Sequence, residues 1–201
     1  LVVDGDDLRA MLTGSGDVAA ALKKLPFIGR MAATAGRKLG LLDDPGRLAK
    51  LTEHYMPIGK DVVIVGGGLV GIELAEFLVD RDRNVTVLEE GPSLATEMAH
   101  PRRWRVLTDL RAHGAKLLTG ATITQIDDGS VSYAVGDGDG GSVSSVEVDS
   151  VVIATGLVAD EGVADAFRSA GFEPTVIGDC KGVGYLEGAM RDGFHAGLAV
   201  G

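Results

Sequence analysis

The chain has 201 residues, 45% of them hydrophobic and 24% charged, which is enough for one sizeable α/β domain or two smaller units. Its net charge of −10 is uneven: residues 1–60 carry nine Lys and Arg against seven Asp and Glu, and residues 61–201 carry ten against 22. The acidic part argues against nucleic acid as a partner, and no apolar run approaches the roughly 20 residues of a membrane span. Cys180 is the only cysteine, which excludes an internal disulfide, a CxxxxC redox pair and a cysteine-held zinc or iron–sulfur site within this chain.

Residues 1–58 are predicted to form an N-terminal segment, in which a strand end at 1–3 is followed by a helical insert. Apolar residues recur at helical spacing over 17–24, 27–42 and 48–55. The basic insert has two interpretations: it lies on a membrane surface, or, as we prefer, it packs against the body of the protein or another domain. Because the sequence begins at Leu1 without a methionine, we expect it to be a piece of a longer protein.

From Asp61 the pattern changes to alternating strands and helices, and the first of these units carries a glycine motif. The β-branched run at 62–65 is typical of a parallel strand covered on both faces. In the GxGxxG that follows, Gly66 permits a tight turn, Gly68 leaves room for a phosphate, and Gly71 lets the helix pack close to the strand. A merely structural glycine turn is the competing interpretation. The motif predicts a dinucleotide pyrophosphate at the helix N-terminus, on Gly66, Gly67, Gly68, Leu69, Val70 and Gly71.

A second strand is predicted at 85–88, and Glu89 ends it, 23 residues after Gly66. A carboxylate at this position accepts hydrogen bonds from the adenosine ribose and repels a 2′-phosphate, which favours NAD(H) over NADP(H). The neighbouring Glu90 could serve instead. Glu89 could also be no more than a charge at a strand end.

Together with the residues up to Gly156, these units predict an α/β fold class: a Rossmann-like, mostly parallel sheet with a β-meander packed on one side. We expect a helix over 101–113 that buries Trp104, Leu107 and Leu110, then a short strand at 115–118. Apolar and polar residues alternate over 122–126, 131–135 and 143–148, as in half-buried antiparallel strands. The glycine-rich tip at 136–141 has the wrong spacing for a calcium loop, so no metal site is expected. A buried strand at 151–154 leads to Thr155 and Gly156.

After Gly156 the sequence predicts a helix over 163–170, a strand over 174–180 and a C-terminal helix over 185–200. Asp179, which follows Gly178 at the end of that strand, could hold a ribose or ribityl chain or could cap the next helix, and the sequence does not decide between them. Cys180 is expected to be a small buried residue. No side chain is assigned as a catalytic acid, base or nucleophile, and the four scattered histidines are expected at the surface or in packing.

Three motifs give the chain a resemblance to a known family. The segments 65–75, 151–156 and 177–180, with the ending 186–196, resemble the C-terminal part of NADH:flavin oxidoreductases of the 2,4-dienoyl-CoA reductase and trimethylamine dehydrogenase type. The resemblance implies an FAD-binding domain split by an inserted NAD(P)-binding domain. Residues 59–156 would be the insert, and residues 1–12 and 157–201 would be parts of the FAD-binding domain. Thr155, Gly156, Gly178 and Asp179 then join the cofactor-binding residues.

The resemblance also implies a function, an electron-transfer module that passes electrons from NADH to flavin. FAD would bind in the parent protein, whose own GxGxxG would precede Leu1. An FMN-binding barrel and an iron–sulfur cluster would lie in the missing N-terminal part, which is the expected partner. The alternative is a non-catalytic adenine-nucleotide-binding module that docks the FMN barrel. We expect a cytoplasmic protein.

Overall fold

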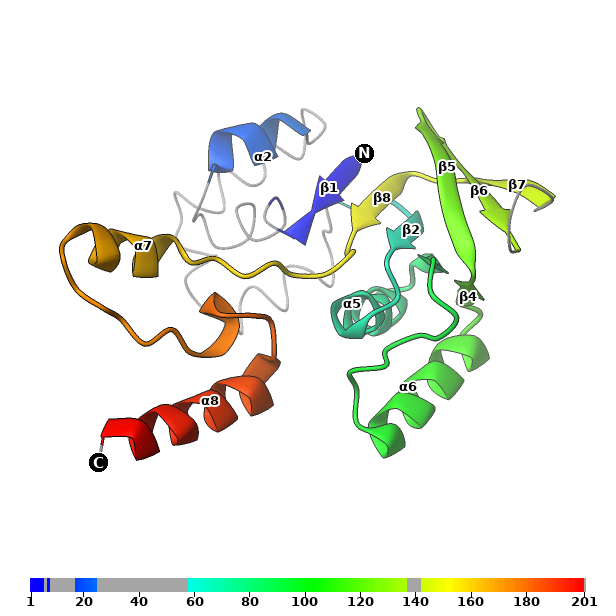
Figure 1. Ribbon diagram of the computed structural model, residues 1–201. Coiled ribbons are helices and arrows are strands. Elements are labelled where there is room, and N and C mark those ends of the chain that lie inside the picture. The colour runs from blue at the N-terminus through cyan, green and yellow to red at the C-terminus, as the bar shows by residue number, and fades with distance from the viewer. Residues whose placement is uncertain (6, 8–16, 25–57, 137–141, 201) are drawn as a thin grey trace, which may run out of the picture. The chain divides into compact units, whose positions relative to one another are not determined.

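The computed structural model describes residues 1–5, 7, 17–24, 58–136 and 142–200 (Figure 1). The chain divides into two compact units, Leu1–Thr155 and Gly156–Gly201. In the first, helix α2 (Val18–Lys24) confirms the helix expected over 17–24, and the Asp17 carboxylate accepts a hydrogen bond from the Ala20 N–H at its start. The helices expected over 27–42 and 48–55, and the glycine-rich tip after Gly136, lie outside the described residues.

A parallel sheet forms the centre of the first unit, with strand order β1-β8-β2-β3-β4. Its central strand β2 (Asp61–Val65) buries Val62 to Val65, as the β-branched run predicts. The neighbours are β3 (Asn84–Glu89) and β8 (Ser150–Ile153), and the sheet continues with β4 (Lys116–Thr119) and β1 (Val2–Asp4). Val65 pairs with Leu88 on one side and Ile153 on the other, so the carboxyl ends of these three strands meet at one edge.

Strand β1 lies at one edge of the sheet that holds the glycine motif, where it pairs in parallel with β8. The assignment of residues 1–12 and 157–201 to an FAD-binding domain stays a prediction. A three-residue strand carries no sequence signal for its pairing partner, which only the folded sheet reveals.

Two helices cover one face of the sheet, α5 (Leu69–Val79) and α6 (His100–Ala112) (Figure 1). Ile72, Ala75 and Leu78 of α5 are buried in one core with Val62 and Ile64. In α6 the expectation for Trp104 was wrong, because its side chain is 68% exposed. The inward face carries Val106 and Leu110, four residues apart, and Trp104 lies two residues before Val106, about 200° around the helix.

The other face of the sheet is covered by the antiparallel meander. It consists of β5 (Ala121–Asp127), β6 (Ser130–Val135) and β7 (Ser142–Glu147), in that order. Ala121 and Val131 of the meander are buried in a second core with Val63, Leu88 and Val151 of the sheet. The predicted fold class is therefore confirmed. Strand β2 has buried residues in both cores, so packing on both faces of the sheet holds its carboxyl end in place.

The second unit contains α7 (Gly162–Ser169), a 3₁₀ turn η1 (Gly178–Cys180) and α8 (Tyr185–Val200). Both helices agree with the sequence prediction. The strand expected over 174–180 is absent: residues 172–177 have no regular structure, and the Gly-Asp pair lies in η1. No strand is described in this unit, so the segment has no neighbour with which to exchange backbone hydrogen bonds.

Candidate nucleotide-binding site

The glycine turn begins where β2 ends. Gly66 has φ +104°, and a Cβ atom at this position would lie 2.3 Å from the carbonyl oxygen of Ala154. Its N–H donates to the carbonyl oxygen of Leu88 at 2.8 Å, which ties the turn to β3. Both the left-handed conformation and the contact with the backbone just after β8 require glycine.

Gly71 brings helix α5 against the turn. A Cβ atom on Gly71 would lie 1.9 Å from the carbonyl oxygen of Gly66, and Gly71 itself is buried. No side chain fits between these two backbone segments. The first turn of α5 is therefore held directly above the carboxyl end of β2, which is the place where open parallel sheets bind ligands.

The start of α5 offers hydrogen-bond donors that no other described group uses. The N–H groups of Leu69, Val70 and Gly71 make no hydrogen bond to another described group, and the N-cap residue Gly68 provides no side-chain cap. The helix dipole adds a partial positive charge at the same end. These donors fit a phosphate group, and the missing side chain of Gly68 removes one obstacle to its approach.

Glu89 folds back over the glycine turn. One carboxylate oxygen, Oε2, accepts a hydrogen bond from the Gly67 N–H at 2.6 Å, and Oε1 accepts one from the Gly91 N–H at 2.7 Å. Each carboxylate oxygen has two lone pairs, so both keep capacity to accept a ribose hydroxyl. Glu89 is thus more than a strand-end charge, whereas Glu90 is exposed and has no hydrogen bond to another described residue.

A loop after β3, residues 94–98, docks on the turn and was missed by the sequence analysis. The Ala95 N–H donates to the carbonyl oxygen of Gly67 at 2.7 Å, and Leu94 Cδ2 would lie 2.2 Å from a Cβ atom on Gly67. Leu94 and Ala95 are both buried. The available signal was Gly67 itself, a glycine that the GxGxxG spacing does not require and that here admits a second chain segment.

The remaining predicted residues divide between the two units. Thr155 lies at the glycine turn, with its Cα 3.0 Å from a Cβ atom built on Gly66. Gly156, Gly178 and Asp179 belong to the second unit. Asp179 Oδ1 accepts hydrogen bonds from the N–H groups of Gly184 and Tyr185, at 2.9 and 3.0 Å, and so caps α8. Cys180 is exposed, not buried as expected, because η1 turns it toward solvent.

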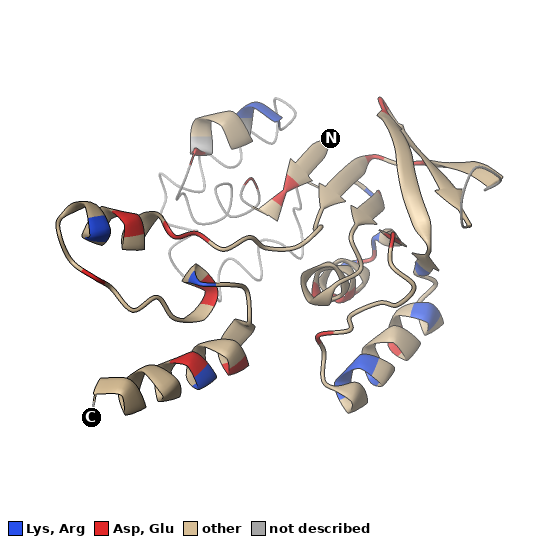
Figure 2. Cartoon of the chain, in the orientation of Figure 1, with Lys and Arg blue, Asp and Glu red and all other residues tan. Residues whose placement is uncertain are grey.

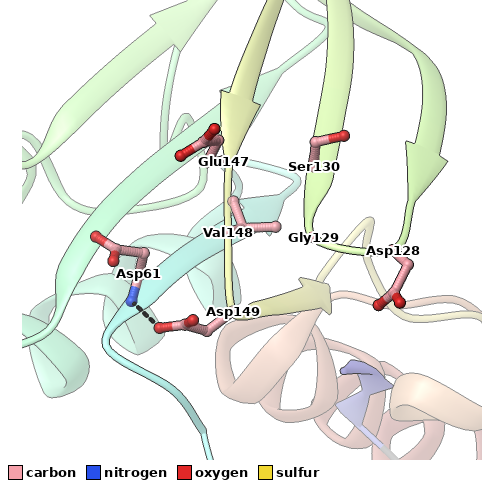
Figure 3. Close-up of a pocket in the computed structure, with 7 residues that line it drawn as sticks. All are labelled: Asp61, Asp128, Gly129, Ser130, Glu147, Val148 and Asp149. Carbon is pink, nitrogen blue, oxygen red and sulfur yellow. Dashed lines mark hydrogen bonds between the residues drawn. The ribbon is translucent and has the colours of Figure 1, made fainter.

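A pocket at the opposite end of the sheet does not suit a nucleotide. It has a volume of about 620 Å³ and is lined by four carboxylates, those of Asp61, Asp128, Glu147 and Asp149 (Figure 3). The N–H groups of Asp61 and Lys60 hold the pKa of Asp149 below its ordinary value. The pocket would repel phosphate, and Asp149 serves to join the starts of β2 and β8.

The part of the chain that the structure describes offers neither a metal-binding group of three or more His, Cys, Asp or Glu residues nor a helix long and apolar enough to cross a membrane.

The parallel sheet, the glycine turn, the free helix N–H groups and the carboxylate on the adjacent strand define a dinucleotide-binding α/β domain of the Rossmann type. Within that class, the chain belongs to the pyridine nucleotide-disulphide oxidoreductase family, whose model matches residues 13–179. Family membership indicates a domain that binds FAD or NAD(P) and works in an oxidoreductase.

The relatives are also oxidoreductases. The chain is 30% identical to NADH oxidase of Thermoanaerobacter brockii over 143 residues, covering 70% of this chain and 21% of that protein. It is 30% identical to bilirubin reductase of Mediterraneibacter gnavus over 147 residues, covering 73% and 22%. The chain thus spans about a fifth of the length of these relatives.

Solved structures show the same arrangement. A 2-naphthoyl-CoA reductase complex matches with a TM-score of 0.57 and 31% identity, covering 73% of this chain and 22% of the other. Histamine dehydrogenase from Rhizobium sp. 4-9 matches with a TM-score of 0.58 over 74% of this chain and 24% of the other, at 18% identity, and supports the fold alone.

Proposed function

We propose that the first unit binds NAD(H) at the carboxyl end of its parallel sheet and presents it to a flavin. The observation that carries the proposal is the set of N–H groups at Leu69, Val70 and Gly71, which donate to no other described group and follow directly on the glycine turn. The pyrophosphate would accept these hydrogen bonds. The nicotinamide and the flavin supply the hydride chemistry, and the residues of this chain bind and orient them.

Glu89 supports a preference for NAD(H) over NADP(H). Its carboxylate is held in place by two backbone N–H groups, at the end of the strand next to β2. From there it accepts hydrogen bonds from the adenosine ribose, and its charge opposes a 2′-phosphate. Glu90 adds a second negative charge at the same strand end.

The whole protein is proposed to be a larger cytoplasmic flavoprotein of the 2,4-dienoyl-CoA reductase type. The support is the similarity to an NADH oxidase and a 2-naphthoyl-CoA reductase, both far longer than this chain. FAD would bind in the parent protein with help from Gly178 and Asp179. An FMN barrel and an iron–sulfur cluster would lie in other parts of the polypeptide, which would be the partner of this chain.

The proposal is tested by calorimetric titration of the purified chain with NADH, NADPH and ADP. We expect NADH to bind more tightly than NADPH, and Gly68→Val to abolish binding. The fold of this variant should survive, because the atoms nearest a new Cβ belong to the flexible end of Glu97. Undiminished NADH affinity in a folded Gly68→Val chain would refute the pyrophosphate assignment. If ADP and NADH bind equally well and Glu89→Ala weakens neither, a structural nucleotide-binding module would be favoured.

A further inference from the structure

A carboxylate faces the pyrophosphate end of α5, although the glycine motif does not call for one. A Cβ atom built on Gly68 would lie 3.1 Å from Oε1 of Glu97 and 3.9 Å from Oε2. Gly68 is the N-cap residue of α5, so the carboxylate of Glu97 lies next to the first turn of the helix. Its only described hydrogen-bond partner is the hydroxyl of Thr96, at 3.5 Å.

The position of Glu97 is set by the backbone around it. The Ala95 N–H donates to the carbonyl oxygen of Gly67, and the Met98 N–H donates back to the carbonyl oxygen of Ala95 at 3.1 Å. Ala95 has a left-handed φ of +46°, and Ala95 and Met98 are both buried. The exposed Glu97 therefore lies in a tight turn with buried residues on both sides.

Helix α6 secures the same loop from its other side. Arg103, on the first turns of α6, donates through Nε to the carbonyl oxygen of Leu94 at 2.7 Å. Figure 2 shows basic residues along α6, all of them arginine, and Arg103 is the one whose contact with this loop is described. The loop is thus held between the glycine turn and α6, and the side chain of Glu97 is exposed on it.

We propose that Glu97 is a specificity-determining residue that limits the negative charge the site accepts; this inference rests on the proposed nucleotide function. The positive end of α5 attracts the Glu97 carboxylate in the free protein. An incoming pyrophosphate must displace that carboxylate or bind beside it, at a Coulombic cost that grows with the charge of the ligand. Glu97 accordingly lowers affinity for all adenine nucleotides, and most for those with a terminal phosphate, such as ADP.

The test measures binding of ADP and NADH to the wild-type chain and to Glu97→Gln, at low and high salt. We expect Glu97→Gln to bind NADH about 3-fold and ADP about 10-fold more tightly, with both gains shrinking at high salt. Glu97→Asp keeps the charge but shortens the side chain, and it should stay close to wild type. Glu147→Gln makes the same change of charge at the opposite end of the sheet and should have no effect.

The outcomes separate the two proposals. If wild type binds NADH and Glu97→Gln binds NADH and ADP no more tightly, the role of Glu97 is wrong and the nucleotide site stands. An equal gain in affinity in Glu147→Gln would show that the effect depends only on the net charge of the chain, and would also overturn the inference. If neither wild type nor Glu97→Gln binds NADH or ADP, the proposed function and this inference fail together.

Discussion

Glu89 and Gly67 are joined by a 2.6 Å hydrogen bond from the Gly67 N–H to Oε2, which links the end of β3 to the turn after β2. The other carboxylate oxygen holds the Gly91 N–H. Glu89 therefore has a role within the protein besides its proposed role toward a ligand: it joins the glycine turn to Gly91, three residues before the loop that carries Glu97. Because Glu89 has both roles, its effect on stability and its effect on nucleotide choice are measured separately.

Replacing Glu89 by alanine is expected to destabilise the fold. The Gly67 and Gly91 N–H groups lose their acceptor in a half-buried site, which costs about 1–3 kcal/mol. Urea unfolding measures the loss. Glu90→Ala is the matched control and should stay within about 0.5 kcal/mol of wild type, because Glu90 is exposed. Equal stability of the two variants would show that the Glu89 hydrogen bonds contribute nothing.

Replacing Glu89 by arginine is expected to shift nucleotide preference toward NADPH. The substitution removes the acceptor for the ribose hydroxyls and places a guanidinium where a 2′-phosphate would lie. The ratio of NADPH to NADH dissociation constants should fall by about tenfold or more, since a charge-assisted hydrogen bond contributes roughly 1.5–3 kcal/mol. An unchanged ratio in a folded variant would refute the ribose-binding role of Glu89.

Gly71→Ala is expected to destabilise the first unit by about 2–4 kcal/mol, measured by thermal or urea unfolding. The new Cβ would lie 1.9 Å from a backbone oxygen, that of Gly66, so β2 and α5 would have to move apart. Gly68→Ala is the control: its Cβ would meet only the end of the Glu97 side chain, at 3.1 Å, which can move away. A Gly71→Ala chain as stable as Gly68→Ala would contradict the close packing.

The sequence predicted the elements whose signal is local and repeated. The β-branched run of β2 and the alternating pattern over 131–135, observed as β6, both agree with the structure. For α8, the predicted bounds were those observed. Each of these features depends on the pattern of residues within one strand or helix. The Rossmann-like class followed from the order of such elements.

The failures concern contacts between segments. Trp104 was expected to be buried with Leu107 and Leu110, but its angular position on α6 points it away from Val106. The strand expected before Asp179 has no partner strand among the described residues of its unit, and the same residues form an irregular segment and a 3₁₀ turn. The loop over Gly67 depends on contacts between residues nearly thirty positions apart, which no local pattern encodes.

Stability toward acid should depend on the ion pair between α5 and α6. Arg102 donates from both terminal nitrogens to the Glu76 carboxylate, at 3.0 and 2.5 Å. These hydrogen bonds hold the pKa of Glu76 below its ordinary value of 4.5. A carboxyl group whose pKa is lower in the folded state stabilises the protein above the unfolded pKa, and that stabilisation disappears as the pH falls through the folded pKa.

The variant Glu76→Gln is therefore expected to be less stable than wild type at pH 7, by about 0.5 kcal/mol because the pair is partly exposed and screened. The difference should close as the pH is lowered from 5 toward 3, as measured by urea unfolding at each pH. Glu73→Gln is the matched control: this exposed glutamate of the same helix forms no ion pair with another described residue. Its difference from wild type should remain nearly constant. A gap for Glu76→Gln that stays open at pH 3 would show that the substitution acts through packing and not through the charge on Glu76.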